Sequence, residues 1–595
     1  MPMIMLKKIL NTIAIALLLI NGATAQDKIK RIKAFAKAYG YVKYFHPSTE
    51  NTLVDWDNFA AYGVEEILKC SNNEEARHTL SELFAPIGPT IRFSSDSVGF
   101  DISRITPEQG ASYLPTYWQH AGVSKGMTNG PYQSYKSVLV NHYEEIDDTT
   151  HVLHESIFTE YPEIGEVISK PIAANIYCQI PLVLYTRDGR TYPKSHNLEK
   201  LEAAIAQTDT SLTSLAIRLG NVVNIYNVIQ HFYPYFDEVD VDWDAQLEMA
   251  LQRSFSDTGA DDHVVTLQKL TATIKDGHLW VWQGPSAYGF YPDVHWEWIQ
   301  DSLVITKVMN DTVDIQVGDV VTKINNQEPH KYFEEVNSRI SYGTKTYLNY
   351  SNKARSLSAK KDAPLLLEIN NQEISLRHHR SISQYTLARP SIQANMYKLL
   401  DGDVMYISLA TIRRDTLTKL LPELTKMKGL VCDFRGHNYH IWDFFKHFLQ
   451  DEVTGASIVK IPRVIYPDQE RPVGFEESQY PSEPQSPYLG DIKTVFIIDG
   501  RVKSSAESFM NSIKRHGLGT IVGEQSAGAN GMMNPFQISG EVSIYWTGAK
   551  VTNDDGSQFH GIGITPDIEV HKTIQGIRDG KDEFLDKAIE ILRGY

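Results

Sequence analysis

The chain has 595 residues, which is too many for a single hydrophobic core, so several domains are expected. Its formal net charge is −16 with histidine neutral, and no basic stripe interleaved with aromatic residues occurs, which argues against nucleic acid as a partner. The three cysteines, Cys70, Cys178 and Cys432, are widely spaced and lack any metal-ligand pattern, so we expect buried free thiols.

The first 25 residues contain the three parts of a secretory signal peptide in the usual order. Lys7 and Lys8 precede an apolar run over residues 9–20, and Ala23-Thr24-Ala25 forms a small-residue cleavage site. The apolar run is short for a transmembrane helix, and no later stretch is long enough to span a bilayer. We therefore expect a periplasmic or extracellular mature protein that begins near Gln26 and has no integral membrane segment.

Residues 31–57 and 218–244 form an internal repeat that aligns without gaps. Both copies show apolar residues at helical spacing, an aromatic-proline break, a loop, and a second amphipathic helix opened by Asp-Trp-Asp. Two copies are too few for a solenoid, so the pattern indicates duplication of one helical module. We assign the first module to residues 26–93 and the second to residues 212–292.

The two copies differ after their last helix. The second copy continues with Asp276-Gly277-His278 before a strand, whereas the first continues with Pro89-Thr90-Ile91. A histidine in this position is, taken alone, more often a helix C-cap or a surface residue than a reactive group.

The segments on either side of the second copy are predicted to be rich in β-structure. Residues 94–211 show short alternating runs separated by Gly, Pro, Asn and Asp, which predicts a β-rich accessory domain. Residues 293–380 contain Gly318-Asp319 and Ile324-Asn325, and this pattern resembles the G-D-x-V-x-x-I-N signature of PDZ domains. PDZ domains bind extended peptides as an added strand, so the resemblance implies capture of polypeptide substrates. A spacer barrel or a lid is the alternative.

The remaining residues, 381–595, alternate between predicted strands and helices, which indicates a largely parallel sheet. Strands are expected over residues 404–409, 429–436 and 495–498, with a helix over residues 416–427 between the first two. The strand ending at Ile498 leads through a tight turn into serines at a helix start.

Ser504 lies at this helix start, where free N–H groups and the positive end of the helix dipole would stabilise an oxyanion. The local sequence is equally compatible with a helix cap, in which Ser504 is the N-cap and Glu507 completes a capping box.

The run D-G-R-x-x-S-S-A-E-x-F over residues 499–509, followed by I-V-G-E-Q-S-A-G, resembles the nucleophile region of S41 serine peptidases. This family comprises the C-terminal processing and tricorn-type proteases. The resemblance implies that Ser504 is the nucleophile and that His278, in its D-G-H sequence, is the general base. No lysine occurs over residues 523–531, where the processing branch places its base, so the resemblance is to the tricorn-like branch.

The phrase GLVCDFRG, ending at Gly436, resembles the S41 segment that helps to form the oxyanion hole. The resemblance implies that the N–H groups of Gly436 and Ser505 stabilise the oxyanion. The chain then continues with His437-Asn438 in place of the usual glycine-rich run. We expect Asp433 and Arg435 in this phrase to form a structural ion pair.

The G-x-G-I-x-P-D sequence over residues 561–567 resembles the closing strand and turn of S41 catalytic domains. Tricorn-like members have a glutamate beside this sequence that completes the charge relay, and His560 occupies that position here. Another departure from some relatives is Gly277, which stands where they have serine. The group that orients His278 is therefore open among four candidates, namely Gln558, His560, Asp276 and Glu524.

These patterns together predict a multidomain α/β protein. An S41-type α/β catalytic core carries an inserted PDZ-like domain and follows helical and β-rich accessory domains. The predicted function is that of an exported serine endopeptidase with no metal and no cofactor. The alternatives are a non-catalytic peptide-binding protein with a peptidase fold, and a hydrolase of esters or other acyl groups.

Overall fold

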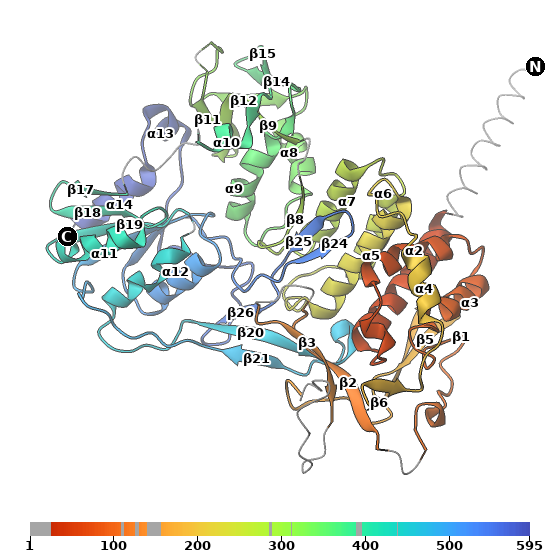
Figure 1. Ribbon diagram of the computed structural model, residues 1–595. Helices are drawn as coiled ribbons and strands as arrows, with labels where there is room; N and C mark the ends of the chain where they lie inside the picture. The colour runs from red at the N-terminus through yellow and green to blue at the C-terminus, as the bar shows by residue number, and fades with distance from the viewer. Residues whose placement is uncertain are drawn as a thin grey trace, which may run out of the picture.

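The computed structural model describes residues 25–108, 112–124, 130–139, 156–284, 288–310, 312–387, 396–436 and 438–594. All but the last residue of the predicted signal peptide lies outside these ranges. No helix within them has the length and apolar character needed to cross a bilayer. Figure 1 shows a helical part at the right, a domain of strands and helices at the top, and an α/β domain at the left, with a long sheet below.

The two predicted helical modules each contain three helices, followed by a strand. The first has a helix that reaches residue 45, then α2 (Trp56–Leu68) and α3 (Asn73–Phe84). The second has α5 (Leu215–Phe232), α6 (Trp243–Ser254) and α7 (Ala260–Ala272). The second helix of each copy begins at an aspartate N-cap, because the carboxylates of Asp55 and Asp242 each accept a backbone N–H.

The two modules pack directly on each other and share one hydrophobic core. The side-chain amide of Asn227 donates to the carbonyl oxygen of Ala36 at 2.9 Å. A Cβ atom at Gly40 would lie 1.8 Å from Asn227 Oδ1, so only glycine allows this approach of the helices. The duplicated sequence therefore folds as a face-to-face pair of modules.

The β-rich accessory segment contributes to two sheets. A three-stranded sheet has the order β1-β5-β4, and a larger sheet runs β21-β20-β2-β6-β7, with β26 paired to β20 and β3 to β2. The strands of the accessory segment are β1 (Arg92–Ser94), β2 (Leu114–Ala121), β3 (Gln133–Val138), β4 (Val167–Ala173), β5 (Ile176–Pro181), β6 (Leu184–Arg187) and β7 (Arg190–Tyr192). One helix, α4 (Leu198–Ile205), follows them.

The larger sheet crosses the predicted boundary between the accessory segment, residues 94–211, and the segment predicted to be catalytic, residues 381–595, which we call the catalytic segment. Its strands β20 (Ser457–Val464), β21 (Phe475–Ser478) and β26 (Lys550–Asn553) come from the catalytic segment. They join the accessory strands where β2 pairs with β20 at His120 and Val464. Strands pair through their hydrogen-bonding edges whatever their separation in sequence, which is why this continuity leaves no signal in the local pattern.

The segment predicted to be PDZ-like contains a five-stranded antiparallel sheet of order β10-β11-β12-β14-β15 with its own apolar core. Its elements, with the short sheet β13-β9-β16, are β9 (Tyr288–Tyr291), β10 (Val294–Ile299), β11 (Ser302–Val308), β12 (Val320–Ile324), α8 (Pro329–Asn337), α9 (Lys345–Ser356), β13 (Ala359–Lys360), β14 (Pro364–Ile369), β15 (Gln372–Arg377), β16 (Arg380–Ser381) and α10 (Ile382–Leu387).

The catalytic segment contains a six-stranded sheet of order β17-β18-β19-β22-β23-β27. Only the first pair is antiparallel, as expected from strands that alternate with helices. Its elements are β17 (Tyr397–Leu400), β18 (Val404–Ser408), α11 (Arg414–Leu424), β19 (Gly429–Asp433), β22 (Lys493–Ile498), α12 (Ser505–Arg515), β23 (Thr520–Gly523), β27 (Ile568–Glu569), α13 (Ile574–Asp579) and α14 (Glu583–Arg593).

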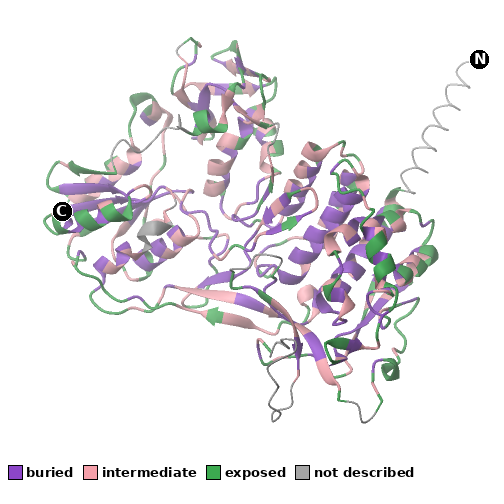
Figure 2. Cartoon of the chain, viewed as in Figure 1, coloured by how far each residue is buried: buried purple, intermediate pink, exposed green. Residues whose placement is uncertain are grey.

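Helices cover both faces of this sheet, and every residue of β18 and β19 is buried, as the purple strands at the left of Figure 2 show. One face packs on α11 and α12, and the other packs on α14. The predicted strands and the helix of this segment are confirmed within a few residues. Four short 3₁₀ helices complete the described elements: Glu50–Thr52, Ile102–Arg104, Tyr439–Phe448 and Pro467–Gln469.

A small antiparallel sheet of order β24-β25-β8 joins the second helical module to the catalytic segment. It consists of β8 (Trp280–Gln283), β24 (Phe536–Ile538) and β25 (Val542–Tyr545). Figure 1 shows it near the centre of the molecule, between α9 and α7.

The three cysteines are buried and unbonded to one another, as expected from their spacing.

Candidate active site

Ser504 lies on a sharp turn between the buried strand β22 and helix α12. Its backbone has φ 59° and ψ −127°, a region that non-glycine residues rarely occupy. The turn is also crowded, because a Cβ atom at Gly500 would lie 2.5 Å from the backbone of Thr346 at the start of α9. The strand, the close approach at Gly500 and the helix together fix Ser504, which is half-buried, in the turn after the end of β22.

Glu507, one turn into α12, is fully buried and accepts hydrogen bonds from the residues around the nucleophile turn. Its Oε1 atom accepts from Ser526 Oγ at 2.5 Å and from Gly528 N at 2.7 Å. Its Oε2 atom accepts from Ala529 N at 3.0 Å and from Ser504 N at 3.3 Å. The last bond is one half of a capping box, so Ser504 is the N-cap residue of α12. A capping role and a catalytic role are compatible at this position.

Burial raises the pKa of Glu507 to about 7, whereas its hydrogen bonds lower it. All four partners donate to this side chain, so the hydrogen bonds favour the ionised carboxylate while burial favours the protonated acid. Glu507 thus holds the loop over residues 526–529 against the turn that carries Ser504.

The N–H of Ser505 is the first of the helix and points out of the N-terminus of α12. Within the described residues it donates to no backbone oxygen. The other predicted oxyanion donor, Gly436 N, donates instead to the carbonyl oxygen of Phe434 at 2.7 Å. Gly436 is therefore available to an oxyanion only after this tight turn opens, whereas Ser505 is available as the structure stands.

His278 follows α7 in a turn that a neighbouring strand holds by its side chains. The Nδ1 atom of His278 lies 2.9 Å from Thr547 Oγ1. Thr547 in turn donates from Oγ1 to Asp276 Oδ1 at 2.7 Å and from its backbone N to Asp276 Oδ2 at 2.6 Å. Asp276 also accepts the His278 N–H at 2.9 Å. Asp276, Thr547 and His278 are all buried.

This network assigns the tautomer of His278. A threonine hydroxyl has one proton, and Thr547 gives that proton to the Asp276 carboxylate. Thr547 Oγ1 therefore accepts from His278, so the proton of the neutral imidazole lies on Nδ1. Nε2 is then the basic nitrogen, as a general base requires.

Ala529 connects the histidine turn with the serine turn. A Cβ atom at Gly277 would lie 2.4 Å from Ala529 Cβ, so the backbone next to His278 packs on this residue. The carbonyl oxygen of Ala529 accepts the N–H of Ser504 at 3.0 Å. The turn that carries Ser504 and the turn that carries His278 therefore both contact Ala529. The contact also explains Gly277, because the serine of some relatives would clash here.

The other candidates for orienting His278 have different contacts. Burial lowers the pKa of His560, and the nearby Asp276 opposes that effect, while the ring stacks on Tyr235 with centroids 4.1 Å apart. Gln558 is exposed and donates to the His560 carbonyl oxygen at 2.7 Å. Glu524 lies 3.2 Å from His571 Nδ1. Of the four candidates, Asp276 is the one that reaches His278 Nδ1, and it does so through Thr547.

Thr547 was not among the residues predicted from the sequence. Tyr545-Trp546-Thr547 continues from β25, where side chains alternate between the two faces of the sheet. Trp546 enters the core, so its neighbours face the other way, toward the histidine turn. This alternation was the available signal, but Thr547 lies 269 positions from His278 in the chain.

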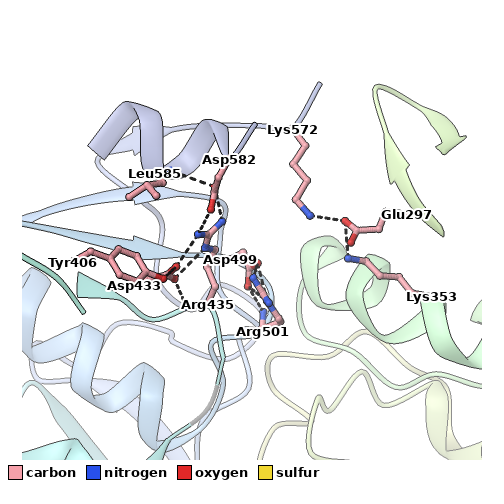
Figure 3. Close-up of polar contacts among 10 residues, drawn as sticks. All are labelled: Glu297, Lys353, Tyr406, Asp433, Arg435, Asp499, Arg501, Lys572, Asp582 and Leu585. Atoms are coloured by element: carbon pink, nitrogen blue, oxygen red, sulfur yellow. Dashed lines mark hydrogen bonds and ion pairs between the residues drawn. The ribbon is translucent and has the colours of Figure 1, made fainter. Parts of the chain in front are cut away.

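Asp433 and Arg435 form a structural ion pair, as predicted. Figure 3 shows that Arg435 lies between two carboxylates, with Nη2 at 2.7 Å from both Asp433 and Asp582. Tyr406 adds a hydroxyl bond to Asp433 at 2.9 Å. The group ties the ends of β18 and β19 to the start of α14, and a second pair, Asp499 with Arg501, lies beside it at the end of β22.

A second charged group in Figure 3 joins the five-stranded domain to the catalytic segment. Glu297 of β10 contacts Lys353 of α9 at 2.9 Å and Lys572, after β27, at 2.6 Å. The two ammonium groups outweigh burial and lower the pKa of Glu297. Among the described residues, no group of histidine, cysteine and carboxylate side chains is arranged to hold a metal ion.

The family model described as peptidase family S41 matches residues 403–570, which include the strand–turn–helix that carries Ser504. No curated protein matches the chain in sequence.

Structures of mature CPAF are among the solved structures with a similar fold. Mature CPAF in complex with lactacystin has a TM-score of 0.52 at 12% identity, covering 63% of this chain and 97% of that one. A second structure of mature CPAF gives 0.51 at 12% identity, with coverage of 63% and 96%. The photosystem II D1 C-terminal processing protease gives 0.35 at 14% identity, with coverage of 60% and 93%. At these identities the similarity concerns the fold.

Proposed function

We propose that this chain is an exported serine-type endopeptidase of the S41 kind, in which Ser504 is the nucleophile and His278 the general base. The observation that carries the proposal is the hydrogen-bonded series His278–Thr547–Asp276, which assigns the Nε2 lone pair of His278 to proton transfer. Its support is geometric, since the turns of both residues meet at Ala529.

In the proposed reaction, Ser504 Oγ attacks the scissile carbonyl carbon while Nε2 of His278 takes the hydroxyl proton. The tetrahedral oxyanion accepts the Ser505 N–H and gains from the positive end of α12. The imidazolium formed in this step is stabilised through Thr547 by the negative charge of Asp276. His278 then gives the proton to the leaving amine, and water repeats the sequence to release the acyl group.

The unusual backbone of Ser504 supports the same assignment. Positive φ at a non-glycine residue costs free energy, on the order of 1–3 kcal/mol, and persists only where the surroundings impose it. Here Glu507, Ala529 and Gly500 impose it. A serine that was only a helix cap would adopt an ordinary extended conformation at no such cost.

Export and capture of the substrate complete the proposal. The order of charge, apolar run and small residues at the N-terminus supports cleavage of a signal peptide near Gln26. N-terminal sequencing of the protein recovered outside the cytoplasm would locate that cut. The five-stranded domain, which is tied to the catalytic segment through Glu297, supports a PDZ-like role in holding polypeptide.

The decisive experiment compares the mature protein and its Ser504→Ala variant on an unfolded protein substrate. We expect cleavage by the first and none by the second, together with covalent labelling of Ser504 by a serine-directed probe. Equal cleavage by both would exclude Ser504 as the nucleophile.

Two other results would favour the alternative functions. Peptide binding without cleavage by either protein would identify a non-catalytic binding protein, which the engaged Gly436 N–H specifically favours. Turnover of esters without turnover of peptides would identify an acyl hydrolase.

A further inference from the structure

The small sheet β24-β25-β8 has one buried face and one open face. Val281, Val542 and Ile544 enter the main hydrophobic core. On the other face of β8, the side chains of Trp280 and Trp282 are 46% and 50% exposed. Exposing an indole ring to water is unfavourable, so two exposed indole rings on one short strand indicate a binding surface.

The exposed apolar surface extends across the sheet. Trp280 pairs directly with Tyr545, and their ring centroids lie 4.7 Å apart. Beyond Tyr545, Met533 forms a bridge with Thr547 and is 51% exposed. We call this surface the aromatic shelf. It consists of Trp280, Trp282, Tyr545 and Met533.

The shelf begins at the proposed active site. Trp280 is two residues after His278, and the intervening Leu279 is buried. Tyr545 is likewise two residues before Thr547, with the buried Trp546 between them. Both strands therefore lead from the hydrogen-bonded residues His278 and Thr547 directly onto the shelf.

One edge of β8 is open to a further strand. β8 is the last strand in its sheet, and its pairing with β25 uses one edge only. In the described part of the chain, residues 280–283 make no backbone hydrogen bond on the other edge. Past its end, Gln283 and Glu541 line an open hollow of about 480 Å³ together with residues 210–213. An added strand would therefore meet unpaired backbone groups along this edge of β8.

We propose that the aromatic shelf and the open edge of β8 bind an extended segment of the substrate, next to the bond that is cut, and select large apolar side chains there. This inference rests on the proposed function and adds the substrate class, namely unfolded polypeptide with aliphatic or aromatic residues at alternate positions. Backbone hydrogen bonds to β8 hold the segment, and every second side chain contacts the shelf.

An extended peptide fits this surface better than a folded partner does. Trp280 and Trp282 face the same way because residues two apart in a strand share a face, and a bound strand presents its side chains with the same period. A substrate in this position also runs past His278, which places one of its peptide bonds at Ser504.

The first test measures binding without cleavage, in the full mature chain with Ser504→Ala. Two fluorescent peptides of equal length and charge are compared, one with Leu and Phe at alternate positions and the other with Ser there. We expect the apolar peptide to bind at least about tenfold more tightly, and Trp280→Ser with Trp282→Ser to remove this difference. The matched control is Tyr480→Ser, an exposed aromatic elsewhere on the catalytic segment (64% exposed), which should keep the preference.

The second test maps the bonds that the wild-type enzyme cuts in an unfolded protein, by mass spectrometry. We expect large apolar residues at alternate positions on one side of the cut, and loss of that enrichment with a KM at least about tenfold higher in the double variant. If the double variant has a lower thermal unfolding midpoint than wild type, Trp282→Ser alone replaces it, since that side chain is half exposed.

The outcomes separate this inference from the proposed function. Tight binding of the apolar peptide to the shelf, with no cleavage by wild type, supports the inference and contradicts the endopeptidase. Cleavage with an unaltered preference in the double variant overturns the inference alone. A change from dimer to monomer in the double variant, with peptide binding retained, would show that the shelf is a contact between two copies, and would also overturn it.

Discussion

The two helical modules each have three helices, and the second helix of each begins at an aspartate cap, yet only the second module contributes a residue to the proposed active site. In both, the turn after the third helix is tied down from the aromatic-proline segment. In the first module, Ser48 donates to the carbonyl oxygen of Ile87 at 2.8 Å. In the second, the Tyr233 hydroxyl donates to the equivalent carbonyl oxygen of Ile274 at 3.0 Å. The two modules therefore hold this turn in the same way.

Each module also has a buried histidine near this turn, but the two histidines have different surroundings. His46 of the first module bonds to Ser48 and Thr90, and burial, with Lys136 nearby, lowers its pKa to about 3. It is a neutral structural residue. His278 of the second module contacts a threonine whose proton is held by a carboxylate. The two turns therefore differ through Asp276 and the segment after β25 that carries Thr547, rather than through their helices.

The largest loss of activity is expected from removing the imidazole of His278, which distinguishes the second module. We expect His278→Ala to lower kcat for peptide cleavage by about 10⁴-fold, because the nucleophile loses its base. Rates on an unfolded protein substrate, with the unfolding midpoint recorded alongside, check this. Undiminished activity in a folded His278→Ala protein would exclude His278 as the base.

Changing Asp276 or Thr547, which hold the ring of His278, should have the next largest effect on kcat. Asp276 accepts two hydrogen bonds from Thr547, and asparagine can accept only through its one oxygen, so Asp276→Asn should lower kcat by about 10²-fold. Thr547→Val should have a similar effect and Thr547→Ser should restore most of the rate. If valine and serine behave alike at position 547, the hydroxyl has no role in orienting His278.

Glu507 gives a smaller effect with a characteristic pH dependence. Glu507→Gln places an amide N–H₂ against groups that donate, and we expect kcat to fall by about tenfold. The variant should also change how stability depends on pH.

The sign of that dependence follows from the raised pKa of Glu507. The unfolded chain releases this proton near 4.5 and the folded chain near 7, so the folded state holds one more proton between these values. The free energy of unfolding should therefore fall as the pH rises through this window, by about 1.4 kcal/mol per pH unit for this group. Denaturant unfolding of wild type and Glu507→Gln at pH 5, 6 and 7 isolates the effect. Parallel profiles for the two proteins would show that Glu507 is ionised throughout.

The smallest effect on activity is expected in the first module. His46→Phe removes the bonds to Ser48 and Thr90 and leaves a buried hydroxyl unsatisfied, so the free energy of unfolding should fall by about 1–3 kcal/mol. Because these residues belong to the structural turn, kcat/KM per folded molecule should stay within about twofold. A large loss of activity without a loss of stability would mean that the two modules are coupled.

Much of the catalytic segment was predictable because local patterns determine it. Buried runs such as residues 495–498 predict parallel strands, and the S-S-A-E sequence predicts the helix start at Ser504. The repeat predicted two helices in each copy from their apolar spacing, the second of them opened by Asp-Trp-Asp. The structural role of Asp433 and Arg435 was also predictable, since both lie at the end of one strand.

The sequence by itself determined the elements, the duplicated module, the serine turn and the identity of the single histidine that follows a third helix. Only the tertiary structure decided what surrounds that histidine. Thr547 reaches it because β25 pairs with β8, and Ala529 brings the serine turn to Gly277 because the loop after β23 is fixed by Glu507. These contacts join residues more than 200 positions apart in the chain, and no local periodicity encodes such pairings because they depend on which surfaces meet when the modules pack.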